Sequence, residues 1–235
     1  METHRVRAHN SAPDSENRIH DDQTAASLGF RGGLVPGVTV YGYMTVPVVR
    51  GFGTEWLARG GMRVRFLQPA YEDDELAVEL SGNAVRVLRE EAACAIGEVF
   101  WVETPPPDLA DYPERPLPDE RPAASAESLA PGTILGTVYT DLSPAEPVDP
   151  LTLSNHLLMR NVKLGPWIHT ASEIRNFSLA HDGDHVAVRG RVAERFERKG
   201  HQFVVLDVVV VGKGGRVIQQ VRHTAIYQLR KRWDR

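Results

Sequence analysis

Length, composition and charge describe an ordinary globular protein and exclude several classes of partner. The chain has 235 residues, of which 42% are hydrophobic and 25% charged, and its formal net charge is −4 at pH 7. Nucleic acids and anionic membranes attract a basic surface, so we expect neither as a partner. The sequence contains no run of about 20 apolar residues, which is the length needed to span a bilayer. The first residues lack the apolar core of a signal peptide, so we expect a cytoplasmic protein.

The first 104 residues predict a strand, two helices and a sheet. Asp21 and Asp22 are expected at the start of the first, short helix, where the helix dipole favours negative charge. Pro47 falls inside the longer helix and should kink it. The last strand of this half is expected to be short or missing. The expected elements are a strand at 4–9, helices at 24–28 and 37–50, and strands at 61–68, 75–88 and 91–103.

A proline-rich segment then predicts a linker. Eight of the sixteen prolines lie between Pro105 and Pro131, and proline continues neither a regular helix nor a central strand. We therefore divide the chain into an N-terminal repeat at residues 1–104, a linker at 105–131 and a C-terminal repeat at 132–235.

The second half predicts a strand, a helix and four further strands. Pro150 follows Asp149 at a favourable helix start, and leucines recur at roughly helical spacing until Gly165 and Pro166 end the pattern. Such a helix must bury its apolar face, and the sheet is the surface available to it. The strands are expected at 133–139, 168–179, 184–198, 201–212 and 217–229.

The two halves contain a repeated segment. Residues 64–78 align with residues 174–188 at a constant shift of 110 positions. Each copy reads as a strand, an acidic turn and a second strand, which predicts a duplicated unit. The identical pairs are Arg65 and Arg175, Ala70 and Ala180, Asp74 and Asp184, Ala77 and Ala187, and Val78 and Val188.

Three short segments of the first half form a recognisable motif. They are Asn-Arg-Ile-His-Asp-Asp from residue 17, Ala-Ala-Ser-Leu-Gly-Phe from residue 25 and Gly-Leu-Val-Pro-Gly from residue 33. This motif resembles that of the MaoC-like and (R)-specific enoyl-CoA hydratase family. The repeated order of elements is similar to the double hotdog fold, an α+β fold in which each repeat wraps a long antiparallel sheet around a central helix. The resemblance implies a hydratase or dehydratase whose substrate is a coenzyme A or carrier-protein thioester, and it implies no cofactor.

The resemblance also implies roles for individual residues. His20 takes the position of the base that activates water, and Asn17 matches the family's asparagine. Gly37, at the start of the central helix, takes the position whose amide receives the thioester oxygen, with Val38 beside it. A neutral imidazole is a base near its working pH, and a helix N-terminus offers free N–H groups to a developing enolate.

Two positions depart from the pattern of the family. Ser15 stands where the family has its catalytic aspartate, and Asp14 lies one residue earlier. In an extended chain a shift of one residue points a side chain the other way, although a loop can absorb it. For both residues a turn or capping role competes with catalysis. Pro36 replaces the family's histidine before the helix glycine.

Further candidates lie on the central helix and in the second half. Tyr41 is expected either in the core or facing an acyl tunnel. Asn155 and His156 lie on the second helix, and His223 lies on the last strand. His169 is the first choice for a second polar, substrate-binding site. For each of these histidines a buried ring satisfied by a neighbouring backbone group competes with a functional role.

The remaining sequence features predict no metal site and are compatible with a homodimer. None of the nine histidines has metal-ligand spacing. Cys94 lies in an apolar run, which favours a packed thiol over a nucleophile. Exposed sheet edges in a double hotdog would allow a homodimer.

Two other functions stay open beside hydration. A hotdog protein can instead hydrolyse a thioester, for which Asp149 is the available carboxylate near the start of the second helix. A non-catalytic acyl-thioester-binding protein or partner subunit is the other, and the departures at Ser15 and Pro36 support it.

Overall fold

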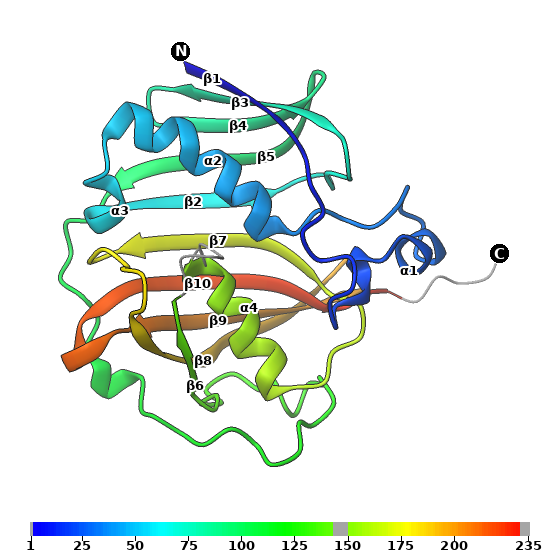
Figure 1. Cartoon of the computed structure of the whole chain (residues 1–235). Helices are drawn as coiled ribbons and strands as arrows, with labels where there is room; N and C mark the ends of the chain where they lie inside the picture. The colour runs from blue at the N-terminus through cyan, green and yellow to red at the C-terminus, as the bar shows by residue number, and fades with distance from the viewer. Residues whose placement is uncertain (1, 143–149, 231–235) are drawn as a thin grey trace.

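Ten antiparallel strands form one sheet, and two long helices lie across one of its faces (Figure 1). The structure is a computed structural model that describes residues 2–142 and 150–230. The strands are β1 (Glu2–Arg7), β2 (Gly60–Phe66), β3 (Glu75–Ser81), β4 (Ala84–Arg89), β5 (Ala92–Trp101), β6 (Val138–Asp141), β7 (Ile168–Asn176), β8 (His185–Arg198), β9 (His201–Val211) and β10 (Val217–Gln228). Their order across the sheet is β1-β3-β4-β5-β2-β7-β10-β9-β8-β6.

The long helices are α2 (Gly37–Phe52) and α4 (Pro150–Asn161). Val40, Met44 and Val48 recur every four residues along α2 and are buried, so one stripe of this helix faces the sheet. Among the described residues no helix is both long and apolar enough to cross a bilayer. The shorter helical segments are η1 (Arg18–His20), α1 (Asp22–Ser27), α3 (Trp56–Arg59), η2 (Leu109–Asp111) and η3 (Lys213–Gly215).

The two halves of the sheet have the same topology. The first half runs β1-β3-β4-β5-β2 and the second runs β6-β8-β9-β10-β7, and the halves meet where β2 pairs with β7. The repeated acidic turn also has the same local structure twice. The Asp74 carboxylate accepts the backbone N–H of Tyr71 at 2.9 Å, and the Asp184 carboxylate accepts that of His181 at 2.9 Å. The structure is thus that of the predicted duplication.

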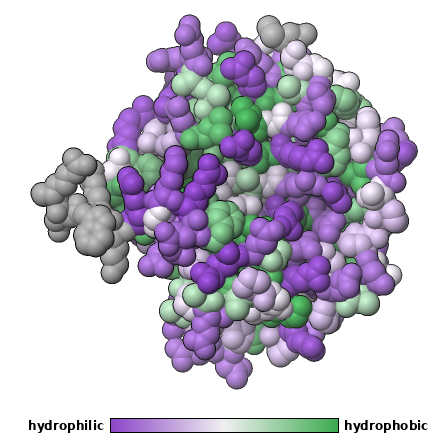
Figure 2. Space-filling view, turned by 180° about the vertical axis from the view of Figure 1, so that it is seen from behind, coloured by the Kyte–Doolittle hydropathy of each residue, from purple (hydrophilic) through white to green (hydrophobic). Residues whose placement is uncertain are grey.

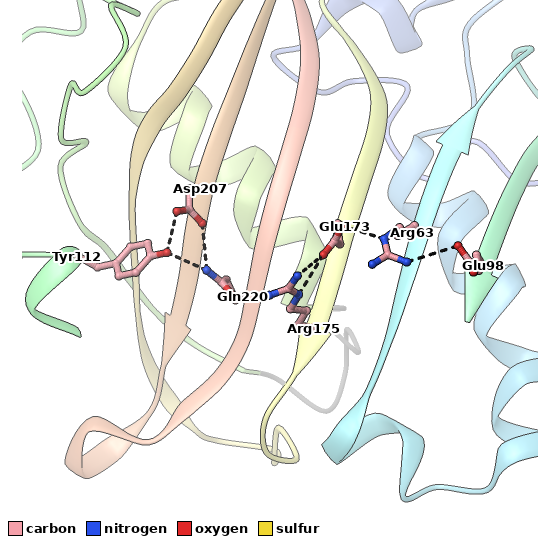
Figure 3. A network of polar contacts seen from close by, with 7 residues as sticks. All are labelled: Arg63, Glu98, Tyr112, Glu173, Arg175, Asp207 and Gln220. Carbon is pink, nitrogen blue, oxygen red and sulfur yellow. Dashed lines mark hydrogen bonds and ion pairs between the residues drawn. The ribbon is translucent and has the colours of Figure 1, made fainter. Parts of the chain in front are cut away.

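An ion pair lies where the two halves meet. Arg63 pairs with Glu173 across β2 and β7, and these residues are 110 positions apart, so they are equivalent members of the two repeats. The Arg63 Nε lies 3.0 Å from a Glu173 carboxylate oxygen. Figure 3 shows the pair within a row of polar side chains that continues to Glu98 on one side and Arg175 on the other.

The segment between β5 and β6 covers part of the sheet face opposite the helices. Tyr112 packs there against Val209 and Val211, and its hydroxyl donates to the Asp207 carboxylate at 2.8 Å (Figure 3). Burial and that carboxylate raise the pKa of Tyr112. Seen from behind, most of the remaining surface is hydrophilic (Figure 2).

The secondary structure confirms most expected elements and corrects several. Helix α1 begins with Asp21 as its cap, as expected, and α2 continues through Pro47 to Phe52. The expected strand at 75–88 is two strands, because Gly82 adopts a positive φ of 58° and turns the chain between them. The first half therefore has its complete set of strands and lacks none. Strand β1 begins and ends two residues earlier than expected, and the strand expected at 133–139 forms at Val138–Asp141.

Candidate active site

A cavity of about 240 Å³ lies between the two halves at the N-terminal end of α2. The residues that follow β2, the first turn of α2 and the start of β7 form its walls, and they are mainly apolar. Its polar side chains are those of Asn17, His20, Gln68, Asn155, His169 and Thr170.

His20 is held as a neutral imidazole at this cavity. Its Nδ1 lies 2.6 Å from the backbone carbonyl oxygen of Leu34, so Nδ1 must carry the proton and donate it to that acceptor. Burial lowers the pKa of His20, and the hydrogen bond to Leu34 partly opposes the shift. The lone pair is therefore on Nε2, which is the nitrogen a general base uses.

Asn17 connects the His20 loop to the second half. Its side-chain oxygen accepts the backbone N–H of Trp167 at 3.1 Å, and its Nδ2 donates to the Trp167 carbonyl at 3.0 Å. The same Nδ2 lies 3.3 Å from His20 Nε2. Asn17 is buried and also caps η1. One amide thus fixes the loop, the base and the beginning of β7 relative to one another.

Gly37 is the first residue of α2 and lines the cavity. Pro36 precedes the helix and provides no side-chain cap, so the first-turn amides depend on water or a ligand for acceptors. A Cβ at Gly37 would lie 3.0 Å from His169 Nδ1 and 3.2 Å from the Phe66 ring. A side chain at this position would require these neighbours to shift by a few tenths of an ångström, which favours glycine.

The structure places the other predicted residues of the first half outside this cavity. Asp14 is exposed, and the Ser15 hydroxyl donates to the Asn17 carbonyl at 3.1 Å. Val38 packs against the core, and the side chain of Tyr41 is buried and lines a different cavity. No aspartate or glutamate occurs among the described residues that line the His20 cavity.

The second half contributes a buried group of three polar side chains. His169 Nε2 lies 2.8 Å from the Ser172 hydroxyl, which lies 3.2 Å from His223 Nδ1. Desolvation by burial lowers the pKa of both imidazoles. The neighbouring His223 adds to the shift at His169, and a hydrogen bond with the Ala171 backbone partly opposes it. His169 Nδ1 and His223 Nε2 have no hydrogen-bond partner. Pairing of Ser172 with His223 across β7 and β10 creates this group, which the sequence alone did not bring together.

Three further side chains differ in their relation to the cavity. Asn155 projects from α4 to the wall, and its side-chain oxygen has no hydrogen-bond partner. His156, next in sequence, is exposed and does not line the cavity. Cys94 lines it, and burial raises the pKa of the thiol, which keeps it protonated and a poor nucleophile. Within the described ranges no three His, Cys, Asp or Glu side chains are grouped to hold a metal ion.

A second cavity occupies the equivalent position in the duplicate. It measures about 420 Å³ and is lined by residues that follow β7, by Trp56 and by Pro150, the first residue of α4. No histidine, aspartate or glutamate occurs among its described lining residues. In the first half, residues 8–36 connect β1 to α2 and bring Asn17 and His20 to the first cavity. Asp149, the candidate for thioester hydrolysis, lies outside the described residues.

Comparison with solved structures identifies the fold. No known family's sequence profile and no curated protein matches the chain. Rv0216 from Mycobacterium tuberculosis, a double hotdog protein, has a TM-score of 0.63 at 13% identity, covering 96% of this chain and 95% of that one. An N-terminal dehydratase of the difficidin assembly line has a TM-score of 0.59 at 10% identity, with 98% and 94% covered. The acyl-CoA thioesterase II TesB2 from Mycobacterium marinum has a TM-score of 0.55 at 15% identity, with 82% and 88% covered.

These comparisons define the class of protein. The chain has the double hotdog fold, as the order of its elements predicted. At such low identities the likeness extends to the fold and not to a particular family or reaction.

Proposed function

We propose that the protein is a MaoC-like hydratase or dehydratase that acts on an acyl thioester of coenzyme A or of a carrier protein. The observation that carries this proposal is one cavity that contains both the Nε2 of a neutral His20 and the uncapped first turn of α2 at Gly37. The similar folds of a dehydratase and an acyl-CoA thioesterase support the substrate class.

The two groups suit the addition of water to a conjugated thioester. His20 Nε2 takes a proton from water while the water oxygen bonds to the third carbon of a trans-2-enoyl chain. The electrons of the double bond then move toward the thioester oxygen, where the first-turn amides of Gly37 and Val38 stabilise the negative charge. Return of the proton from His20 to the second carbon completes hydration, and the reverse order removes water from a 3-hydroxyacyl thioester.

Asn17 has a positioning role in this mechanism. Its hydrogen bonds to Trp167 hold η1 against β7, and its Nδ2 keeps the His20 ring oriented toward the cavity. The proposal needs no cofactor, because coenzyme A or the carrier arm belongs to the substrate. It also leaves Asp14 and Ser15 out of the chemistry, since neither lines the cavity.

Hydration is tested by following the loss of conjugated absorbance of a trans-2-enoyl-CoA. We expect His20→Ala to lower kcat about 10²–10⁴-fold, the usual contribution of a general base. The matched control is His156→Ala, because His156 is exposed and outside the cavity. Equal rates for His20→Ala and the unaltered protein would overturn the proposal.

Hydrolysis of the thioester is the second candidate function. The specific observation in its favour is that no described aspartate or glutamate lines the cavity beside His20, since a single base is enough to activate water for attack on a carbonyl. Release of free thiol with the double bond intact would assign hydrolysis. Tight binding of several acyl-CoA lengths without turnover would instead assign the non-catalytic alternative.

A further inference from the structure

An unpartnered imidazole nitrogen lies beside the first turn of α2. His169 is only 7% exposed and lines the cavity, yet its Nδ1 has no hydrogen-bond partner. That nitrogen lies 3.0 Å from the position of a Cβ on Gly37, and the Phe66 ring packs edge-on against the imidazole at a centroid distance of 4.7 Å. An unpaired buried polar atom destabilises the folded protein, so its place at a ligand cavity requires an explanation.

We propose that His169 donates a second hydrogen bond, from Nδ1–H, to the thioester oxygen received at Gly37, and that Ser172 and His223 fix the tautomer that makes this possible. The inference rests on the proposed acyl-thioester function and adds a contribution from the second half to a site whose base comes from the first. His169 is a catalytic residue in this scheme, whereas Ser172 and His223 are positioning residues.

The distances favour this tautomer. Ser172 has one hydroxyl proton, so it donates to one imidazole and accepts from the other. The contact to His169 Nε2 is 2.8 Å and that to His223 Nδ1 is 3.2 Å. Hydroxyl donors make shorter hydrogen bonds than N–H donors, which indicates that Ser172 donates to His169 and accepts from His223. His169 then carries its proton on Nδ1, facing the helix terminus.

The alternative arrangement would leave a buried N–H group of His223 without an acceptor. If Ser172 donated to His223, the His223 Nε2 would carry a proton that has no acceptor inside the sheet, where the residue is fully buried. Unpaired buried N–H groups are rarer than unpaired acceptors. The proposed tautomer puts the unpaired N–H on His169, a residue that lines the cavity. Both rings stay neutral because burial lowers the pKa of each, and their centroids are only 4.2 Å apart, which disfavours two charges.

A spectroscopic experiment tests the tautomer without relying on turnover. Long-range proton–nitrogen NMR of ¹⁵N-histidine-labelled protein reports which ring nitrogen is protonated, and we expect Nδ1–H at His169. Butyryl-CoA, a saturated thioester, should shift this proton, whereas S-butyl-CoA, which lacks the carbonyl, should not. Ser172→Ala should change the tautomer and Ser172→Thr, which keeps a hydroxyl, should restore it.

Kinetics with a trans-2-enoyl-CoA test the catalytic consequence. His169→Leu removes the donor, and loss of one oxyanion donor lowers kcat about 10²–10³-fold. His169→Asn places an amide N–H near the position of Nδ1 and should recover part of the loss. Ser172→Ala should lower kcat with little change in KM, and Ser172→Thr should recover it.

The outcomes separate this inference from the proposed function. Hydratase turnover with the Nε2–H tautomer at His169, or with His169→Leu as active as the unaltered protein, would overturn the inference and leave the proposed function standing. A tautomer as proposed that responds to no thioester, together with no turnover, would overturn both.

Discussion

Acid should destabilise this protein through a histidine that has no access to water. His223 is fully buried, and desolvation lowers its pKa from 6.5 to about 3. A pKa that is lower in the folded than in the unfolded state gives a contribution to stability that is complete above 6.5 and is lost as the pH falls from 6.5 toward 3. Each pH unit in that window costs about 1.4 kcal/mol. At about pH 4.5 the loss from His223 alone is therefore about 3 kcal/mol.

The test replaces His223 by asparagine, whose amide can keep a hydrogen bond with Ser172 but does not titrate. Urea unfolding at a series of pH values between about 7.5 and 4.5 gives the pH dependence of the free energy of unfolding for both proteins. The free energy of unfolding of the variant should fall by about 3 kcal/mol less than that of the unaltered protein over this interval, whatever its stability at neutral pH. His181→Asn, at an exposed loop position, controls for the removal of one imidazole. Parallel pH curves for the His223→Asn protein and the unaltered protein would refute the reasoning.

Three further changes test the site and the duplication. Gly37→Ala should lower kcat/KM about tenfold or more, because the added methyl group would lie 3.0 Å from a buried imidazole nitrogen. The control is Gly42→Ala in the same helix, where an added methyl group has no neighbour within 4 Å. This control should raise the free energy of unfolding by about 1 kcal/mol and retain activity. Asp14→Ala should keep kcat for the enoyl-CoA within about twofold of that of the unaltered protein. A loss of about 10²-fold would instead indicate that Asp14 takes part in catalysis. Arg63→Glu should reduce the free energy of unfolding in urea by about 0.5–1 kcal/mol. Adding Glu173→Arg to this variant should recover the lost stability. An unchanged stability in the single variant would show that the ion pair does not stabilise the junction of the two halves.

The sequence predicted regular elements best where apolar periodicity and turn residues agree. The four strands after α4 were expected at their observed positions to within three residues at each end. Strand β7 largely alternates more and less buried side chains, whereas most of β9 is a run of buried apolar residues. The strand expected at 75–88 was wrong because the alternation of buried side chains stops at Leu80 and resumes out of phase at Val85. The four exposed residues between them contain Gly82, whose positive φ of 58° reverses the chain.

The candidate site was predictable only in its local part. Asn17, His20 and Gly37 lie within a short segment, so one motif could identify them together. The contact of Asn17 with Trp167 spans 150 positions, and the Ser172 group depends on the register of β7 against β10. Register is set by the packing of whole strands, which no short sequence pattern records.

Duplication within one chain explains why the site can draw on both halves. In a symmetric pair of identical subunits, a residue on the axis meets its own copy, so a charged side chain there would face a like charge. Here the equivalent positions hold Arg63 and Glu173, which attract each other. The same freedom lets the first half carry residues 8–36, with His20 among them, between β1 and α2. The second half could then keep β7 as a wall, and place His169 opposite a glycine that the first half provides.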